Sequence, residues 1–166
     1  MGKQLLLIRH AKSDWGNAGL RDFDRPLNGR GKNNAPEMAE RLVKQQIVPE
    51  LMVSSPALRA ITTAKYFAAA WHIPIENIQL EPAIYEANVK SLLKVINQLD
   101  DQYDQIALFG HNPGLTDLAN YLCNGHIVNM PTASVIRIQF PFDSWKLISS
   151  NTGNVLLFDY PKSLED

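Results

Sequence analysis

The chain has 166 residues, of which 45% are hydrophobic and 20% are charged, a composition typical of one folded domain over residues 1–166 and not of a disordered segment. Its 16 lysine and arginine residues and 17 aspartate and glutamate residues leave a formal net charge of −1, which excludes the broad positive field of a protein that binds nucleic acid or an anionic membrane. Cys123 is the only cysteine, so neither an internal disulfide nor a cysteine-based zinc site is possible, and we expect a cytoplasmic protein.

The first predicted element is a strand. Residues Gln4–Ile8 form a short apolar run, as expected of a strand buried on both faces. Its apolar part, Leu5–Ile8, is shorter than the ~7 to 15 residues of a signal-peptide core, so we expect neither a secretion signal nor a membrane anchor. The polar pair Arg9-His10 follows this strand directly.

Apolar periodicity and turn residues predict alternating helices and strands along the rest of the chain. Met38, Leu42 and Val43 share one face of a helix expected from about Lys32 to Gln46, and its regular part is expected to start near Pro36. The further elements expected are a strand at 51–53, a helix over 57–71 after the capping sequence Ser54-Ser55-Pro56, a strand at 78–80, a helix over 89–99, a strand at 106–109, a helix over 115–122, and strands at 134–140 and 155–158.

This order of elements predicts an α/β fold, a three-layer α/β/α sandwich with a mainly parallel sheet. The alternating pattern of the C-terminal third is compatible with an antiparallel strand there. In open α/β sheets the ligand site lies beyond the carboxyl ends of the parallel strands. Three polar segments follow predicted strands, namely Arg9-His10, Ser54–Arg59 and His111-Asn112. If these strands are neighbours, the three segments meet in one crevice.

The residue types in these segments suit phosphate chemistry. Arg9 and Arg59 could hold a phosphate through their planar guanidinium groups, which keep their charge. His10 could act as a nucleophile if its other ring nitrogen is held as a donor, and His111 could donate to an oxygen of the phosphoryl group. Each residue alone has an ordinary structural interpretation, in a loop or on the surface. Two arginines and two histidines at successive strand ends favour a functional site.

Three segments resemble the histidine phosphatase superfamily, which also contains the cofactor-dependent phosphoglycerate mutases. Leu7–Ser13 is similar to the Arg-His-Gly signature of this family, with Ala11 in place of the glycine. Ser54–Ala60 is similar to its second arginine segment and Phe109–Gly114 to its second-histidine segment. The small branch of SixA-type phosphohistidine phosphatases is the most similar in length. Further segments similar to that branch are Arg21–Leu27, Ile84–Ala87 and Met130–Ala133.

The resemblance implies a phosphoglycerate mutase-like fold and a role for each motif residue. His10 would be phosphorylated during turnover, and Arg9, Arg59 and His111 would line the phosphate pocket. No cofactor and no metal are implied, since two guanidinium groups and a second histidine carry the charge of the transferred group. Gly16 stands where the mutases have an asparagine that contacts phosphate, so we do not expect that contact. The substrate-binding residues expected in addition are Lys12, Ser13 and Asn112.

Glu86 bears on the class of substrate. In larger members of the family a glutamate from this region of the sequence donates a proton to the leaving alkoxide, and Glu86 would do the same if its carboxylate reaches the pocket. An alcohol leaves poorly without that proton. Imidazole leaves easily because its conjugate acid has a pKa of about 6.5.

We therefore expect a metal-independent phosphatase that forms phospho-His10 and releases inorganic phosphate from a phosphohistidine on a signalling protein. A short chain with few insertions would leave the site open to such a macromolecular side chain. A small-molecule phosphomonoesterase is the first alternative, and a phosphate- or phosphoprotein-binding module without turnover is the second. A mutase is disfavoured because it needs lid insertions that exclude water.

Two charged segments are interpreted as ordinary loops. Arg21–Arg25 could lie at the mouth of the site, but we interpret it as a salt-bridged loop that contributes little energy. Gly29–Lys32 has some features of a phosphate-binding loop, but Asn33 follows where such a loop needs serine or threonine. We interpret this segment as a turn into the next helix.

Overall fold

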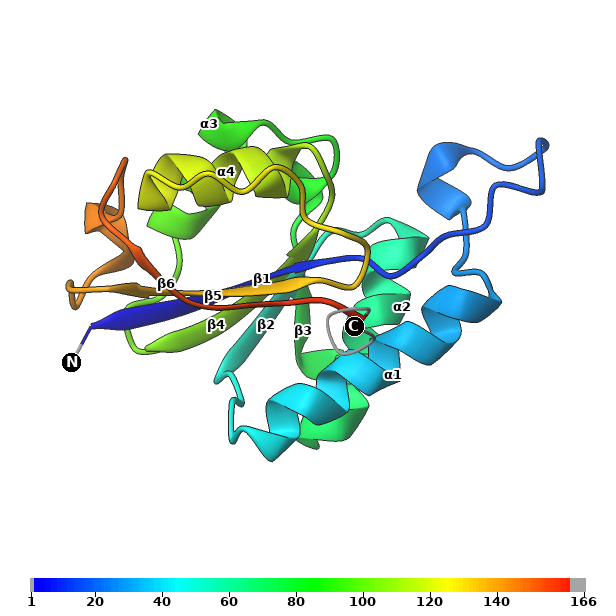
Figure 1. The fold of residues 1–166 in the computed structure, drawn as a ribbon, viewed down its shortest axis with the longest axis horizontal. Helices are drawn as coiled ribbons and strands as arrows, with labels where there is room; N and C mark the ends of the chain where they lie inside the picture. Colours follow the sequence, from blue (N-terminus) through cyan, green and yellow to red (C-terminus); the bar gives the residue numbers. More distant parts are fainter. Residues whose placement is uncertain (1, 162–166) are drawn as a thin grey trace.

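The computed structural model of the chain describes residues 2–161, and within them a six-stranded sheet has the order β3-β2-β4-β1-β5-β6 (Figure 1). Strands β1 to β4 run parallel to one another, whereas β5 is antiparallel to β1 and β6 is antiparallel to β5. The strands are β1 (Lys3–Arg9), β2 (Leu51–Ser54), β3 (Ile78–Leu80), β4 (Gln105–Gly110), β5 (Val135–Phe140) and β6 (Asn154–Asp159). The predicted parallel sheet is confirmed, and both C-terminal strands are antiparallel.

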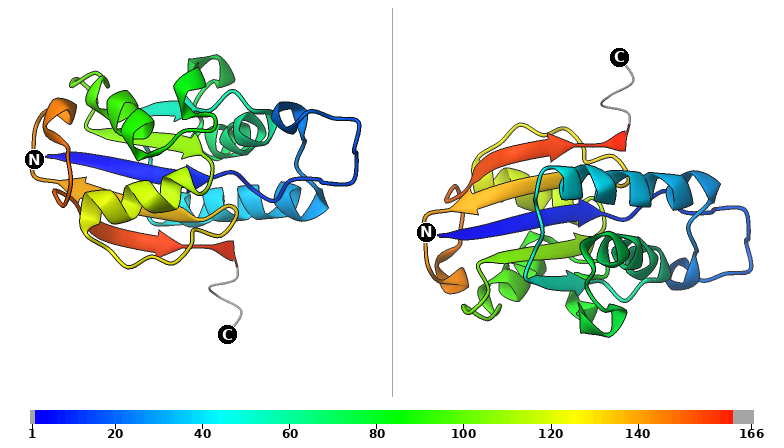
Figure 2. Two further views of the ribbon diagram at one scale, coloured as in Figure 1. Left: turned by 90° about the horizontal axis from the view of Figure 1, so that it is seen from above. Right: turned by 90° about the horizontal axis from the view of Figure 1, so that it is seen from below.

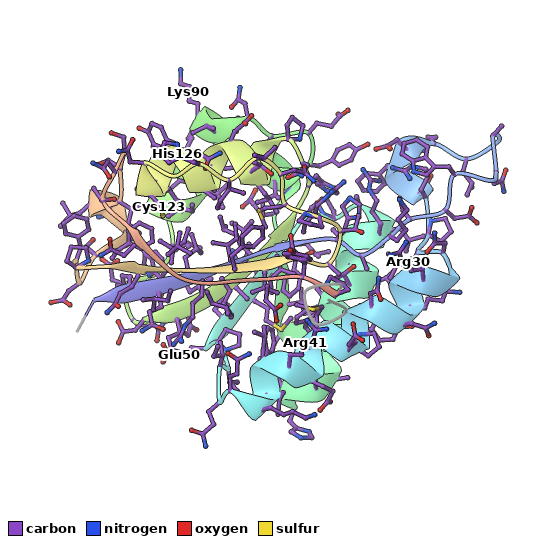
Figure 3. All side chains as sticks on the ribbon, viewed as in Figure 1. Arg30, Arg41, Glu50, Lys90, Cys123 and His126 are labelled. Carbon is purple, nitrogen blue, oxygen red and sulfur yellow. The ribbon has the colours of Figure 1, made fainter. Side chains whose placement is uncertain are left out.

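Helices cover both faces of this sheet, α1 (Gly29–Lys44) and α2 (Leu58–Trp71) on one face and α3 (Val89–Asn97) and α4 (Gly114–Cys123) on the other (Figures 1 and 2). Two apolar cores result, one containing Met38 and Phe67 and the other containing Leu92 and Leu118. Figure 3 shows side chains filling the space on both sides of the sheet. The fold is the three-layer α/β/α sandwich that the sequence predicts. No helix in the described residues is long and apolar enough to cross a membrane.

The central strands are buried because their residues are apolar on both faces. Leu5–Ile8 in β1 and Ile106–Phe109 in β4 are buried throughout. The two strands lie side by side, with Arg9 opposite Gly110, and Ser54 of β2 lies opposite Phe109 on the other side of β4. The polar segments that follow β1, β2 and β4 therefore leave the sheet at the same edge.

The start of α1 differs from the sequence prediction. The helix begins at Gly29, so Gly29–Lys32 forms its first turn and not a preceding turn, and Pro36 lies inside it. Asn28 determines this start because its side chain accepts a hydrogen bond from the backbone N–H of Gly31 at 2.9 Å. A Cβ atom at Gly31 would lie 2.2 Å from the carbonyl oxygen of Lys12, so glycine lets the helix approach the loop after β1.

Candidate active site

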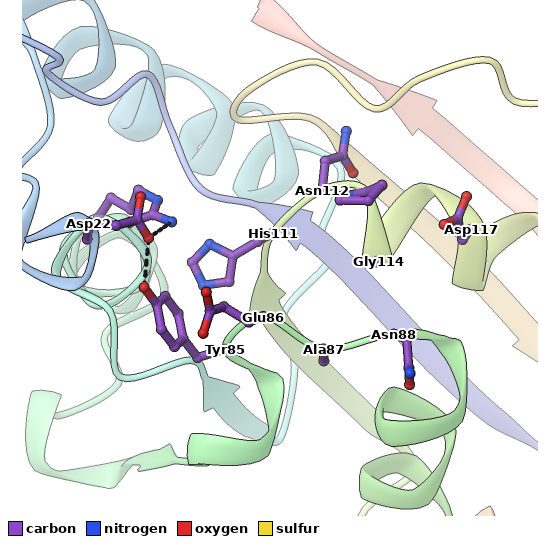
Figure 4. Close-up of a pocket in the computed structure, with 11 residues that line it drawn as sticks. Asp22, Tyr85, Glu86, Ala87, Asn88, His111, Asn112, Gly114 and Asp117 are labelled. Atoms are coloured by element: carbon purple, nitrogen blue, oxygen red, sulfur yellow. Dashed lines mark hydrogen bonds and ion pairs between the residues drawn. The ribbon is translucent and has the colours of Figure 1, made fainter.

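The predicted residues Arg9, His10, Arg59 and His111 line one cavity of about 280 Å³, the inner cavity. A second cavity of about 500 Å³, the outer cavity, adjoins it and is lined by Tyr85 and Glu86 among others (Figure 4). The remaining residues of the inner cavity are Lys12, Ser13, Trp15, Asp22, Arg25, Asn112 and Thr132, and those that line both cavities are Asp22, Arg59, His111 and Asn112. The predicted convergence of the three strand ends is therefore present.

The bonding of His10 leaves one ring nitrogen free to react. Its Nδ1 lies 2.8 Å from the carbonyl oxygen of Ala11. Because a carbonyl oxygen only accepts, Nδ1 carries the hydrogen and Nε2 keeps its lone pair. The backbone is also anchored, since the N–H of His10 donates to Gly110 and the carbonyl of His10 accepts from Ala133. Burial, aided by the charges of its neighbours, lowers the pKa of His10 to about 3, so the ring is neutral at pH 7.

His111 lies beside His10, with the two ring centroids 5.3 Å apart. Its Nε2 forms a hydrogen bond of 2.7 Å with the hydroxyl of Ser55, whose oxygen accepts from the backbone N–H of Ala57. The Nδ1 of His111 is buried and has no hydrogen-bond partner in the described part of the chain. Burial and then the charge of Arg59 lower the pKa of His111 to about 4. Two neutral imidazole rings thus share the inner cavity.

Arg9 and Arg59 are each held by a backbone carbonyl. Arg9 donates from NH1 to Met130 at 2.9 Å, and Arg59 donates from NH1 to the carbonyl of Asp22 at 2.7 Å. The Nε atoms of both arginines are buried and lack an acceptor among residues 2–161. A buried donor without an acceptor costs about 1–3 kcal/mol. An oxyanion bound in the cavity that both residues line would supply acceptors to their remaining N–H groups.

Arg25 lines the inner cavity, although the sequence interpretation favoured a salt-bridged loop for Arg21–Arg25. Salt bridges within Arg21–Arg25 were expected and are present, but Arg25 is only 7% exposed and lines the inner cavity. It donates to Oγ of Ser13 and to the carboxylate of Asp22, and its guanidinium lies 3.5 Å from the centre of the Trp15 ring. The available signal was the resemblance of Arg21–Leu27 to the family pattern.

The three additional residues predicted to bind substrate line the inner cavity but differ in exposure and in hydrogen bonding. Lys12 is exposed, whereas the hydroxyl oxygen of Ser13 already accepts from Arg25. The amide of Asn112 donates to Asn129 and Met130 and accepts from Thr116, and it thereby holds the loop after β4. The binding roles of these residues remain predictions.

Glu86 lies at the outer cavity, and its role as a proton donor stays a prediction. It is exposed and lines the outer cavity together with His111, and Figure 4 shows both side chains among the residues of that cavity. Its backbone has φ of 55°, in the left-handed region that non-glycine residues seldom adopt. Such conformations are concentrated at functional sites. The described residues contain no group of three or more histidine, cysteine, aspartate or glutamate side chains placed to hold a metal ion.

Paired histidines and buried arginines at the strand ends of an α/β sandwich are features of a phosphate-handling enzyme. The chain belongs to the histidine phosphatase superfamily (branch 1), whose family model matches residues 5–92. An uncharacterized chloroplast protein of Arabidopsis thaliana is 29% identical over 154 residues, which cover 88% of this chain and 70% of the relative. Family and fold together support a phosphatase.

Solved structures share the fold along almost the whole chain. SixA from Agrobacterium tumefaciens is 24% identical with a TM-score of 0.80, and the match covers 97% of this chain and 99% of that one. The protein histidine phosphatase SixA complexed with tungstate is 21% identical with a TM-score of 0.82 and the same coverage. A mycobacterial glucosyl-3-phosphoglycerate phosphatase is 16% identical with a TM-score of 0.67, over 95% of this chain and 98% of that one. The predicted phosphoglycerate mutase-like fold is confirmed.

Proposed function

We propose that the protein is a metal-independent phosphatase that uses His10 as its nucleophile and forms a phospho-His10 intermediate. One observation carries this proposal: Nε2 of a neutral His10 keeps its lone pair in a cavity lined by Arg9, Arg59 and His111. Binding of phosphate alone needs cations but no nucleophile held in one tautomer. The geometry therefore supports turnover more than a binding module.

In the proposed reaction, Nε2 of His10 attacks phosphorus, the new N–P bond forms, and the leaving group departs with the electrons of its bond to phosphorus. Water then attacks the phosphorus of phospho-His10, and inorganic phosphate and free His10 result. Arg9, Arg59 and His111 would donate to the non-bridging oxygens during both steps. Phosphoryl transfer depends mainly on such positioning and charge stabilisation. The guanidinium groups would supply the charge that a metal ion supplies elsewhere.

The substrate that we propose is a phosphohistidine on a cytoplasmic signalling protein. The inner cavity adjoins a larger one of about 500 Å³, which leaves room for a side chain carried by a macromolecule. Histidine is also a good leaving group. The test compares hydrolysis rates for a phosphohistidine-bearing protein with those for a panel of small phosphate esters. A clear preference for the esters would reject this substrate.

A small-molecule phosphomonoesterase is the second candidate, and the place of Glu86 favours it. Glu86 lines the outer cavity, as His111 does, and from there it could protonate an alkoxide that leaves from phosphorus in the inner cavity. Phosphohistidine hydrolysis does not need such a donor. The two candidates therefore differ in how strongly they depend on Glu86.

A further inference from the structure

The carboxylate of Asp22 is bound by the same arginines that line the inner cavity. Asp22 lies in a short 3₁₀ helix, Asp22–Asp24. Its Oδ1 accepts from Nε and NH2 of Arg25 at 3.1 and 3.0 Å. Its Oδ2 accepts from NH2 of Arg59 at 3.0 Å and from the hydroxyl of Tyr85 at 2.6 Å (Figure 4). One carboxylate thus takes four hydrogen bonds from three side chains.

Asp22 also lies at the boundary between the two cavities, since it lines both of them. The hydrogen bond from Tyr85, and then those from Arg25 and Arg59, hold the pKa of Asp22 well below its usual range. The carboxylate is therefore ionised wherever the protein is folded near neutral pH. A phosphate in the inner cavity would share Arg25 and Arg59 with this fixed negative charge.

We propose that Asp22 is a specificity-determining residue whose negative charge weakens the binding of anions in the two cavities. Arg9, Arg25, Arg59 and Lys12 surround the inner cavity with positive charge, and such a site would bind the phosphate product tightly and release it slowly. The carboxylate offsets part of that charge and engages N–H groups that would otherwise face the product. This inference rests on the proposed function, because it requires that the inner cavity binds phosphate.

The position of Asp22 has a consequence for the leaving group. A group that leaves toward the outer cavity passes the Asp22 carboxylate. An alcohol that carries its own carboxylate or phosphate is repelled there, whereas a neutral imidazole is not. Asp22 therefore favours phosphohistidine over phosphate esters with anionic leaving groups.

The test measures the binding of inorganic phosphate by calorimetry to the wild type, Asp22→Asn, Asp22→Glu and Asp24→Asn. Asparagine keeps a carbonyl acceptor for Arg59 but removes the charge, so we expect phosphate to bind about tenfold more tightly at low salt, with a smaller gain at high salt. Asp22→Glu restores the charge and should bind phosphate as the wild type does. Asp24 is the matched control, because it lies on the same turn and, within residues 2–161, forms its salt bridge with the 77% exposed Arg21.

Each outcome bears on one proposal. Phosphate affinity that is unchanged or weaker in Asp22→Asn overturns the inference. Loss of the folded state in this variant, measured by circular dichroism, also overturns it, because Asp22 would then be a structural residue. A wild-type protein that neither binds phosphate nor hydrolyses any substrate rejects the proposed function instead. The supporting result is tighter binding in Asp22→Asn together with unchanged binding in Asp24→Asn.

Discussion

The imidazole rings of His10 and His111 lie 5.3 Å apart although one follows β1 and the other follows β4. The pairing of these strands explains the contact: they are parallel neighbours, with Arg9 opposite Gly110, so the next residue of each strand leaves the sheet at the same place. The two rings are held by different partners, His10 by the carbonyl of Ala11 and His111 by the hydroxyl of Ser55. The two histidines have different expected roles: His10 attacks phosphorus, and His111 donates to the non-bridging oxygens.

Replacing His10 by alanine should slow hydrolysis of an aryl phosphate by roughly 10³-fold or more, because it removes the ring nitrogen that we propose to attack phosphorus. Phosphate should still bind, since Arg9 and Arg59 remain. Release of the aryl alcohol measures the rate, and calorimetry measures binding. His72→Ala, at the exposed C-terminal end of α2, is the matched control. Near-wild-type turnover in His10→Ala would reject His10 as the nucleophile.

Arg59→Ala should weaken phosphate binding by about 2 kcal/mol or more, roughly 30-fold, which is the effect of losing a charged partner in a buried site. Arg59→Lys should recover little of this loss, because an ammonium group cannot bond to Asp22 and to an anion with the geometry of a guanidinium. The 77% exposed Arg21, replaced by alanine, provides the control. Unchanged phosphate affinity in Arg59→Ala would remove this residue from the binding site.

Local sequence patterns predicted much of this site because it is built on strand ends. Buried apolar runs located β1, β2 and β4, and the polar residues after them had to meet once these strands proved to be neighbours. Arg25 could not be predicted in this way, because its burial depends on Ser13, Trp15 and Asp22, and only the folded loop brings these residues to it. Three of the four residues before it in the sequence, Arg21, Asp22 and Asp24, are charged, as is typical of a solvated loop.

The start of α1 was predicted too late in the chain, and the place of the Glu86 side chain was left open, for other reasons. Pro36 indicated a helix start, but the side chain of Asn28 begins the helix before it. Glu86 has a left-handed backbone conformation, which the sequence around it does not indicate. Backbone conformations of this kind are imposed by tertiary packing and not by local preference.

Glu86→Gln should separate the two candidate substrates. Glutamine has the same shape but donates no proton to an alkoxide, so hydrolysis of an alkyl phosphate should fall by about 10²-fold or more. Hydrolysis of a phosphoramidate should change by less than about tenfold, because imidazole leaves without a strong acid. The measurement is the ratio of kcat/KM for the two substrates in each variant. Equal losses on both would contradict the proton-donor role of Glu86.

The stability of the protein should depend on pH through the two site histidines. Burial lowers the pKa of His10 to about 3 and of His111 to about 4 in the folded state, below the usual value of 6.5. As the pH falls below 6.5 the unfolded chain takes up protons first, so stability that is complete above pH 6.5 is lost progressively toward pH 4 and below. Each histidine should contribute up to about 1.4 kcal/mol per pH unit to this slope.

Urea denaturation between pH 7.5 and 4.5 measures this slope for the wild type, for the single variants His10→Gln and His111→Gln, and for the double variant. Glutamine keeps a polar side chain of similar length but takes up no proton, so each variant should lose less stability on acidification than the wild type. The double variant should show the smallest slope, because the two rings titrate in one buried site and both contributions are then absent. Slopes identical to the wild type in all three variants would mean that His10 and His111 are already solvated in the folded protein. Solvated rings would not keep the neutral, fixed tautomer that attack on phosphorus requires.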